Sequence, residues 1–443
     1  MSGGEGGQFS RCRRFVLELR FLSMRVENAL FSVEKVHIWA PIASIVPQND
    51  LRFLSGVTIM AVAINRPDHA GVLIDHINDS PERSLSLPPS CYYEQRFLDI
   101  ERNEIFFKSW QFLCHSERLR EAGCYVSGNI LGRSVIAVRG QDEVVRAFYN
   151  VCRHRGHQLV RLDGQARAIT CPYHAWAYNL DGSLRSAPGT ECVKDFRKED
   201  YGLIDVQVEE FAGLYFINLD RSAEPLSNSA RDLKAEVEKY APDLSRLTFA
   251  HRLSYTIQAN WKAVVDNFLE CRHCPVAHKD FCSLIDMNTY EVENRGLFIS
   301  HMAKAKAAVD NSAYNVANAT VDDHAVWYLW PNMALMRYPG RGNFMVWRFV
   351  PDGPETTKEE FDFFFETSTP NEQEQEAIRY IDSVLQREDI DIVESVQRGM
   401  HSPGFRRGPY LIDPKRSGLS EHGVHHFHTM LAKAYSGKAS RGS

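Results

Sequence analysis

Long apolar runs and an excess of either charge are both missing from this 443-residue sequence. No stretch reaches the roughly 18 apolar residues typical of a membrane-spanning helix, so we expect no membrane span. The 57 acidic and 51 basic side chains give a formal net charge of −6. The sequence has no cluster of basic residues of the kind that indicates a nucleic-acid partner. The length allows two domains with cores of their own, at roughly 100–200 residues each.

Cysteine is also scarce, with ten residues in the whole chain. A set this sparse does not form the disulfide framework of a small secreted protein, so a reducing cytoplasm is the expected location. Cys271 and Cys274 form a CxxC pair, but no second CxxC completes a tetrahedral zinc site. We interpret both as packing residues.

The first 59 residues differ from the rest of the chain. They mix arginines and scattered apolar residues, show no clear period and match no tripartite signal peptide. Our hypothesis is that translation begins at Met60 and that residues 1–59 are a non-native or disordered extension. An intact mass of the natively expressed protein that includes Met1 would contradict it. We expect an N-terminal helical segment at 60–119, helical mainly over 89–113.

Two short clips carry soft metal ligands, Cys152-Arg153-His154 and Cys171-Pro172-Tyr173-His174. A zinc knuckle usually groups its ligands as a cysteine pair and a histidine pair. Here each clip carries one of each, which suits a 2Fe–2S centre of the Rieske kind, where two thiolates hold one iron and two imidazoles the other. We predict that Cys152, His154, Cys171 and His174 bind such a cluster. A structural zinc site is the alternative.

Short strands bounded by turn signals surround both clips. We predict strands at 124–131, 134–139, 144–149 and 211–219, and Asp181-Gly182 marks a tight turn. Residues 120–222 are therefore expected to form a small all-β domain that presents both clips at one end. Residues 223–443 would form a second domain.

The clearest helix of the second domain starts at Trp261, and its apolar face is formed by Trp261, Val264, Val265, Phe268 and Leu269. Asp266, Glu270 and His273 gather on the opposite face. We expect the helix to end at Pro275, because proline lacks the backbone N–H and disfavours helix in the preceding residue.

His273 and His278 are five positions apart, and on an unbroken helix they would point away from each other. The break at Pro275 lets them converge, and one carboxylate would complete the facial triad of non-haem Fe(II) oxygenases. Asp389 lies within the apolar stripe of a helix predicted over 371–400, whereas Glu388 lies nearer its edge. A carboxylate in an apolar core is costly unless it is paired or binds a metal. We predict mononuclear Fe(II) bound by His273, His278 and Asp389, with an arginine-paired Asp389 as the alternative.

Strands are expected at 251–258, 326–338, 344–350 and 361–367, and residues 280–323 are expected to mix loop and short elements. Two groups of side chains are interpreted as packing residues, although an aromatic cage and a metal site are their functional alternatives. The groups are the aromatics Trp327, Tyr328, Trp330, Tyr338 and Trp347, and the cluster His422, His425, His426 and His428.

Together these motifs resemble the large (alpha) subunit of Rieske non-haem iron oxygenases, over about residues 90–430. Residues 152–157 and 171–176 look like the cluster signature of that family, and 260–262, 270–275 and His278 look like its iron-site signature. The resemblance implies an α+β fold. A Rieske domain would be joined to a catalytic domain in which helices cover an antiparallel sheet (helix-grip type).

In this family a carboxylate three positions before the first iron histidine bridges to a cluster histidine of the next subunit in a homotrimer. The resemblance assigns that role to Glu270, with His174 as its partner. Glu270 itself, residues 394–399 and residues 425–428 are most similar to the choline, carnitine and betaine monooxygenase branch. Arg272 departs from that branch, where tyrosine is common, and this weakens the transfer of any one substrate.

The resemblance therefore implies a terminal oxygenase that uses O2 and electrons supplied by a flavin- or ferredoxin-type reductase from NAD(P)H. The expected reaction is N-demethylation or C–N cleavage of a quaternary amine or betaine. Ring hydroxylation or O-demethylation of an aromatic acid is the alternative with the same metals. An electron carrier without oxygenase activity is a hypothesis of another class, and it predicts about two iron atoms per chain instead of three.

Overall fold

The computed structural model describes residues 77–306, 323–340 and 342–436. All of them belong to one compact unit, Pro67–Ser443. The extension expected at 1–59, the Met60 hypothesis and the start of the segment expected at 60–119 lie outside the described residues. None of the helices in the described ranges is long and apolar enough to cross a membrane.

The first sheet is antiparallel and has seven strands in the order β1-β10-β9-β4-β3-β2-β5. Its strands are β1 Gln111–His115, β2 Cys124–Ile130, β3 Arg133–Arg139, β4 Val145–Tyr149, β5 Gly164–Gln165, β9 Asp205–Phe211 and β10 Leu214–Asn218. Leu131 and Gly132 both have positive φ, the geometry of a two-residue type I′ turn, and they join β2 to β3. The strands predicted around the clips are confirmed.

A three-stranded sheet, β6 Ile169–Thr170, β7 Ala177–Tyr178 and β8 Leu184–Ser186, follows the first clip. The tight turn predicted at Asp181-Gly182 joins β7 to β8. Gly182 has φ +86, and a Cβ there would lie 2.4 Å from the Phe148 ring. Only glycine fits this position without strain, so the turn holds the second clip against the first sheet.

The second large sheet is antiparallel with seven strands in the order β11-β17-β16-β15-β14-β13-β12. These strands are β11 Thr248–Ile257, β12 Glu291–Arg295, β13 Phe298–Lys304, β14 Asp323–Leu329, β15 Met333–Arg337, β16 Asn343–Gly353 and β17 Thr356–Phe365. Alternate side chains enter different cores. Trp327 packs in a cluster with Leu233 and Val237, whereas Tyr328 packs in a cluster with Val264 and Val393, as the period of two in a strand requires.

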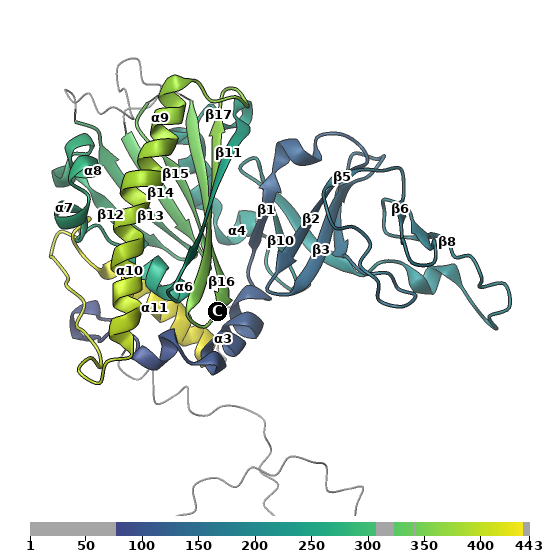
Figure 1. The fold of residues 1–443 in the computed structure, drawn as a ribbon, viewed down its shortest axis with the longest axis horizontal. Helices are drawn as coiled ribbons and strands as arrows, with labels where there is room; N and C mark the ends of the chain where they lie inside the picture. Colours follow the sequence, from purple (N-terminus) through teal and green to yellow (C-terminus); the bar gives the residue numbers. More distant parts are fainter. Residues whose placement is uncertain (1–76, 307–322, 341, 437–443) are drawn as a thin grey trace, which may run out of the picture. The chain divides into compact units, whose positions relative to one another are not determined.

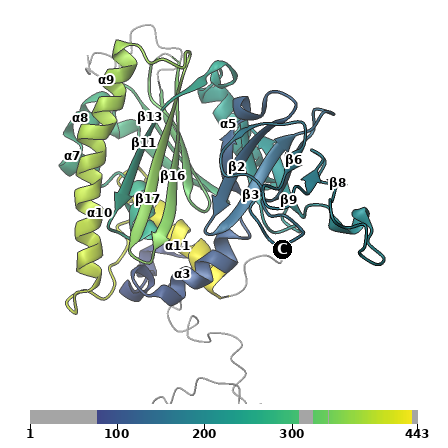
Figure 2. The ribbon, with the colours of Figure 1, turned by 45° about the vertical axis from the view of Figure 1, so that its right-hand side comes forward.

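Helices cover both faces of this sheet, and α9 and α10 lie across one face in Figures 1 and 2. The α-helices are α3 Gln95–Glu101, α4 Leu226–Ser229, α5 Arg231–Tyr240, α6 Trp261–Phe268, α7 Cys274–Ala277, α8 Lys279–Leu284, α9 Glu372–Tyr380, α10 Gln386–Met400 and α11 His422–Tyr435. A π-helical turn, Ile381–Leu385, joins α9 to α10. This is the α+β arrangement implied by the resemblance.

Two expectations about secondary structure are wrong in detail. The single strand expected at 326–338 is the hairpin β14–β15, because Trp330-Pro331-Asn332 turns the chain without a glycine to mark it. The described part of the 280–323 segment contains the short elements α8, β12 and β13, which agrees with the expected mixture. The helical region expected at 89–113 gives way to β1, so the first sheet takes a strand from before residue 120.

Candidate metal centres and substrate pocket

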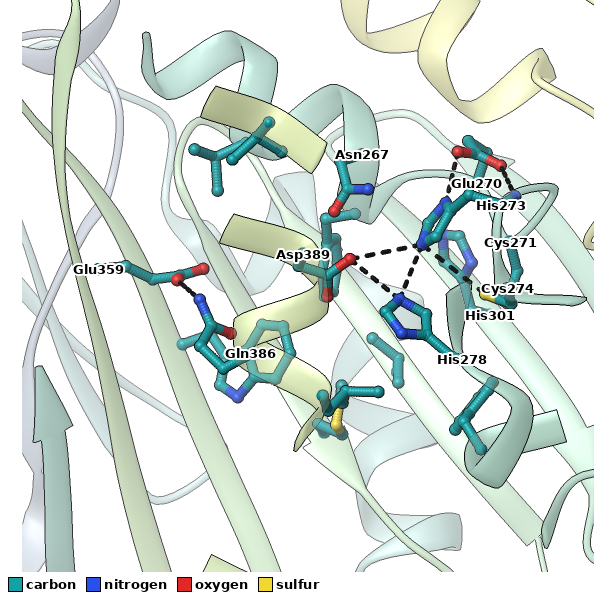
Figure 3. Close-up of a pocket in the computed structure, with 18 of the residues that line it drawn as sticks. Asn267, Glu270, Cys271, His273, Cys274, His278, His301, Glu359, Gln386 and Asp389 are labelled. Carbon is teal, nitrogen blue, oxygen red and sulfur yellow. Dashed lines mark hydrogen bonds and ion pairs between the residues drawn. A yellow bond between two sulfur atoms is a disulfide. The ribbon is translucent and has the colours of Figure 1, made fainter. Parts of the chain in front are cut away.

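Three segments bring His273, His278 and Asp389 together. His273 follows α6, His278 follows the four-residue helix α7, and Asp389 lies in the first turn of α10. The Nε2 atoms of the two histidines are 3.1 Å apart. Asp389 Oδ1 lies 2.9 Å from Nε2 of His278 and 3.6 Å from Nε2 of His273 (Figure 3).

These separations fit one metal ion. Two ligand atoms at right angles around a first-row ion, each bound at about 2.1 Å, are about 3 Å apart. Two imidazoles and one carboxylate on one side of the ion also leave the opposite positions open. In the parts of the chain that the structure describes, this is the one group of three such ligands that the spacing brings together. The triad predicted for Fe(II) therefore has the geometry that it needs.

The other ring nitrogen of each histidine meets a carboxylate. His273 Nδ1 lies 2.6 Å from Glu270 Oε1, and His278 Nδ1 lies 2.8 Å from Glu388 Oε2. An Nδ1–H that donates to a carboxylate fixes the tautomer and leaves the Nε2 lone pair for the metal. This role of Glu388 was not predicted from the sequence, although its place beside Asp389 was a usable signal.

The predicted route to this geometry is wrong in one respect. Helix α6 ends at Phe268, not at Pro275, so Glu270 and His273 do not share a helix face. They lie in a turn where Glu270 also accepts the backbone N–H groups of Arg272 and His273. Pro275 lies in the first turn of the next short helix, α7, instead of ending the first one, which suits its lack of a backbone N–H.

Burial and the neighbouring carboxylates shift the pKa of His278 in opposite directions. Burial opposes its protonated form, but hydrogen bonds and charges from Asp389 and Glu388 outweigh burial and raise the pKa of His278 to about 8. Without a cation, two carboxylates surround an almost fully buried imidazole. A divalent cation would neutralise the same carboxylates, so the charge distribution also fits a metal site.

Cys271 and Cys274 flank His273, and both are buried. Their interpretation as packing residues agrees with that burial, but they are also joined to each other by a disulfide, which was not predicted. The bond closes the turn that carries His273. No feature of the sequence distinguishes this pair from two thiols in van der Waals contact.

The two clips have the same backbone design. Cys152 N–H donates to the carbonyl of His157 and its own carbonyl accepts from Gly156, while Cys171 N–H donates to Trp176 and its carbonyl accepts from Ala175. Gly156 and Ala175 stand at equivalent positions, and both have positive φ. These two matching loops bring the rings of His154 and His174 to a centroid distance of 4.7 Å.

In these loops the cysteine side chains are buried, and the histidine side chains lie nearer the surface. Cys152 and Cys171 are each 2% exposed, whereas His154 is exposed and His174 is half-buried. The Tyr178 hydroxyl accepts the Arg153 N–H at 2.9 Å, so its own hydrogen is available to the Cys152 sulfur 3.3 Å away. Two buried thiolates below two outer imidazoles fit the asymmetric ligand set of a Rieske cluster.

Two family descriptions match the chain. "Rieske [2Fe-2S] domain" matches residues 109–197, and "Ring hydroxylating alpha subunit (catalytic domain)" matches residues 244–437. The Escherichia coli (strain K12) protein "Carnitine monooxygenase oxygenase subunit" is 37% identical over 366 residues, which span 82% of this chain and 97% of that protein. This chain belongs to the Rieske oxygenase alpha-subunit family.

Other relatives are consistent with that membership. "Choline monooxygenase, chloroplastic" of Spinacia oleracea is 31% identical over 363 residues, 79% of this chain and 78% of that protein. The crystal structure of the quaternary ammonium Rieske monooxygenase CntA in complex with L-carnitine matches with a TM-score of 0.73 and 31% identity, over 80% of this chain and 97% of that one. Naphthalene 1,2-dioxygenase from Rhodococcus sp., at 19% identity and a TM-score of 0.71, shares the fold alone.

The family resemblance, the fold class and the oxidoreductase class predicted from the sequence are therefore confirmed. As a member of this family, the Rieske oxygenase carries a 2Fe–2S cluster in its first domain and a mononuclear iron in its catalytic domain. The zinc alternative for the clips is set aside on the same grounds. The roles of individual ligands stay predictions that the geometry supports.

A cavity of this Rieske oxygenase opens beside the triad, between the second large sheet and helices α6 and α10 (Figure 3). Its wall is mostly apolar and aromatic. Outside the triad and its neighbours, the cavity is lined by Ile257, Val264, Phe268, Phe281, Tyr290, His301, His324, Val326, Met336, Tyr338, Trp347, Phe349, Glu359, Leu385, Gln386, Ile390 and Val393.

The two groups interpreted as packing residues have different outcomes. Tyr338 and Trp347 line this cavity, whereas Trp327, Tyr328 and Trp330 lie elsewhere in the cores. The four histidines of α11 accept or donate hydrogen bonds to other parts of the chain, as with His422 to the Val292 carbonyl at 2.8 Å and His428 to Asp266 at 2.8 Å. Their interpretation as packing residues agrees with these contacts.

Proposed function

We propose that this chain is the terminal oxygenase component of a two-protein system that hydroxylates a quaternary ammonium compound. The carbon attacked would be one next to nitrogen, so that the product loses formaldehyde or breaks a C–N bond. The observation that carries this proposal is the aromatic cavity beside the triad, with a buried carboxyl group in its wall.

That wall suits a cation. The rings of Trp347 and Phe349 line it together with Phe268, and aromatic faces attract quaternary ammonium groups. Glu359 is 2% exposed; burial, followed by the charge of Asp389, raises the pKa of its carboxyl group. A buried ammonium group would favour the ionised form of Glu359. The relatives named for carnitine and choline support the same substrate class.

The reaction balances with O2 and two electrons. The substrate N–CH3 group, O2, two electrons and two protons give N–CH2OH and water, and a quaternary N–CH2OH then releases formaldehyde, a tertiary amine and a proton. When bound, the cluster supplies single electrons and the mononuclear iron activates O2. His273, His278 and Asp389 would hold that iron, and Cys152, His154, Cys171 and His174 would hold the cluster.

Glu270 would connect the two centres across a subunit boundary. The strands next to the clips, β6 and β8, and the helices next to the triad, α7 and α8, lie at opposite ends of the described chain in both Figures 1 and 2. A carboxylate on His273 Nδ1 could instead meet the partner subunit's His174 in a ring, which we propose to be a homotrimer. The clips of one subunit and the triad of the neighbouring subunit would then form one path for electrons.

The remaining partners follow from this assignment. A separate flavin- or ferredoxin-type reductase would supply electrons from NAD(P)H, since the two matched domains account for the cluster and the mononuclear iron. We also propose a cytoplasmic location. Apart from the Cys271–Cys274 pair, seven cysteines of the described residues are free, which suits a reducing compartment.

The test is O2 uptake by the purified enzyme with a generic ferredoxin reductase and NADH. We expect uptake coupled to formaldehyde or aldehyde release with carnitine, γ-butyrobetaine, choline or glycine betaine. Uncoupled uptake with all four, together with hydroxylated product from an aromatic acid, would favour the aromatic alternative. About two iron atoms per chain, with no product from any substrate, would favour the electron carrier.

A further inference from the structure

Three buried polar atoms around the cavity have no hydrogen-bond partner among the described residues. They are His301 Nε2, His324 Nδ1 and Trp347 Nε1, in side chains of residues that are only 1%, 2% and 5% exposed. Buried polar atoms in proteins are almost always paired. The unpaired imidazole nitrogens in the wall of this cavity therefore indicate a ligand whose polar group supplies a missing partner.

The two histidines stand at one end of the cavity. His301 on β13 and His324 on the neighbouring strand β14 both face the Tyr290 ring, at centroid distances of 6.0 and 6.3 Å. Trp347 and Glu359 belong to β16 and β17, on the other side of β15. Adjacent strands are about 4.8 Å apart, so β14 and β16 are separated by about 10 Å. The apolar side chains of Val326 and Met336 lie between these ends.

Both imidazoles are neutral. Burial lowers the pKa of His301 and that of His324 to about 3. Burial, followed by the charge of Glu270, raises the pKa of Tyr290, so Tyr290 keeps its phenolic hydrogen. A neutral imidazole carries one N–H, and its place depends on the partner of the other nitrogen.

The position of the N–H in His301 depends on the contact of its Nδ1 with Tyr290. The Tyr290 hydroxyl lies 3.4 Å from His301 Nδ1, and no other described residue hydrogen-bonds to this hydroxyl. In the tautomer in which Tyr290 donates to Nδ1, Nε2 of His301 carries the hydrogen. In that tautomer His301 Nε2–H is a buried donor that lacks an acceptor among the described residues.

We propose that His301 is a specificity-determining residue that donates a hydrogen bond from Nε2 to the carboxylate of a short-chain betaine. His324 lies beside it as the second polar group of this subsite. The inference rests on the proposed function, because it assigns the second charged group of the same ammonium substrate. The betaine would span the cavity, with its ammonium group at Trp347 and Glu359 and its carboxylate at His301.

This orientation accounts for the position of the triad. In the view of Figure 3, Asp389 and His278 lie between Glu359 and His301. A molecule held at both ends would present the carbons next to nitrogen to the open side of the triad. A ligand held by the ammonium group alone could rotate and would present several carbons.

The test compares two ligands that differ in one group, γ-butyrobetaine and butyltrimethylammonium, which has a methyl group in place of the carboxylate. Binding is measured by calorimetry on the anaerobic holoenzyme. A hydrogen bond to a charged group contributes enough that His301→Phe should weaken γ-butyrobetaine about 10- to 100-fold. Its effect on butyltrimethylammonium should be less than about 3-fold.

Two further variants separate binding from structure. His301→Gln retains an N–H donor and should restore most of the preference for γ-butyrobetaine. Tyr290→Phe frees the tautomer of His301 and should reduce the same preference by a smaller factor. Choline, which has a hydroxyl group in place of the carboxylate, shows whether the subsite accepts any oxygen or selects an anion. The cluster absorbance and three iron atoms per chain verify that each variant is folded.

An equal loss for both ligands in His301→Phe, or no loss for either, would overturn the proposal. A failure of the proposed function would look different, because the wild type would then bind neither ammonium compound. In that case benzoate and toluene replace the two probes. If the wild type prefers benzoate over toluene and His301→Phe abolishes that preference, the carboxylate subsite is supported even though the substrate is not an amine.

Discussion

Glu388 Oε2 lies 2.8 Å from Nδ1 of His278, on the side of the imidazole opposite the triad. Glu270 holds the same relationship to His273 at 2.6 Å. Each histidine of the predicted iron site thus has its own carboxylate, one contributed by the turn after α6 and the other by α10. The two carboxylates differ in setting, because Glu388 is 37% exposed and Glu270 is 15% exposed. They should therefore have separable functions.

Replacing Glu388 by Gln should weaken retention of the mononuclear iron. The substitution removes the negative charge that fixes the His278 tautomer and raises its basicity, and loss of such a partner costs roughly 10- to 100-fold in metal affinity or activity. Titration of the iron-depleted enzyme with Fe(II) measures the affinity. Asp391→Asn, an exposed change on the same helix, is the matched control. Equal Fe(II) affinity in both variants would show that Glu388 is only a surface partner of His278.

Glu270→Gln should leave both metal centres loaded yet lower product formation about 10- to 100-fold. The amide oxygen still accepts from His273 Nδ1–H, so the histidine keeps its place, but the charge of the proposed bridge is lost. Iron analysis and the cluster spectrum check loading. The reoxidation rate of the dithionite-reduced cluster, after substrate and O2 are added, checks electron transfer. Normal turnover by this variant would exclude the bridge and leave the clips as a cluster site.

Tyr178→Phe should lower the reduction potential of the cluster. Its hydroxyl group lies 3.3 Å from the Cys152 sulfur, and a hydrogen bond to a cluster ligand stabilises the reduced, more negative state. One hydrogen bond of about 1 kcal/mol corresponds to roughly 40 mV for a one-electron couple. A dye-coupled redox titration measures the shift. Tyr201→Phe, which alters a ring packed on Trp176, should leave the potential unchanged.

The stability of the protein should decrease as the pH falls below 6.5, in part because of His301 and His324. Both stay neutral in the folded chain down to a pKa of about 3, whereas in the unfolded chain they take up protons near pH 6.5. Each therefore lowers the free energy of unfolding by about 2 kcal/mol between pH 6.5 and pH 5.

Denaturant unfolding of the holoenzyme at pH 7.5 and pH 5 measures this loss. His324→Phe should reduce the pH-dependent part by about 2 kcal/mol, and His251→Gln, an exposed change on β11, should not alter it. An unchanged pH dependence in His324→Phe would mean that His324 is protonated in the folded protein at pH 5.

Most of the candidate metal ligands could be predicted from local sequence patterns. The clips were found because each places its two ligands within one short loop, so chain spacing alone fixes their proximity. Asp389 was found because a carboxylate between the apolar residues Leu385 and Val393 is an expensive arrangement without a partner. In each case the informative neighbours lie within a few positions of one another along the chain.

The remaining features depend on contacts between distant segments. Glu388 meets His278 across 110 positions, and His301 Nδ1 has a partner only because Tyr290 approaches it. The end of α6 at Phe268 depends on packing after Leu269, where the Cys271 N–H donates to the Gly418 carbonyl. The secondary-structure propensity of one segment does not indicate which distant residues it will contact.

The sequence by itself therefore determined the family and predicted the two ligand sets, because short-range spacing encodes them. Only the tertiary structure decided which carboxylates support which histidines, where α6 ends, and which buried polar atoms face the cavity. Those outcomes follow from burial and hydrogen bonding between elements far apart in the chain, and their energies depend on a three-dimensional environment.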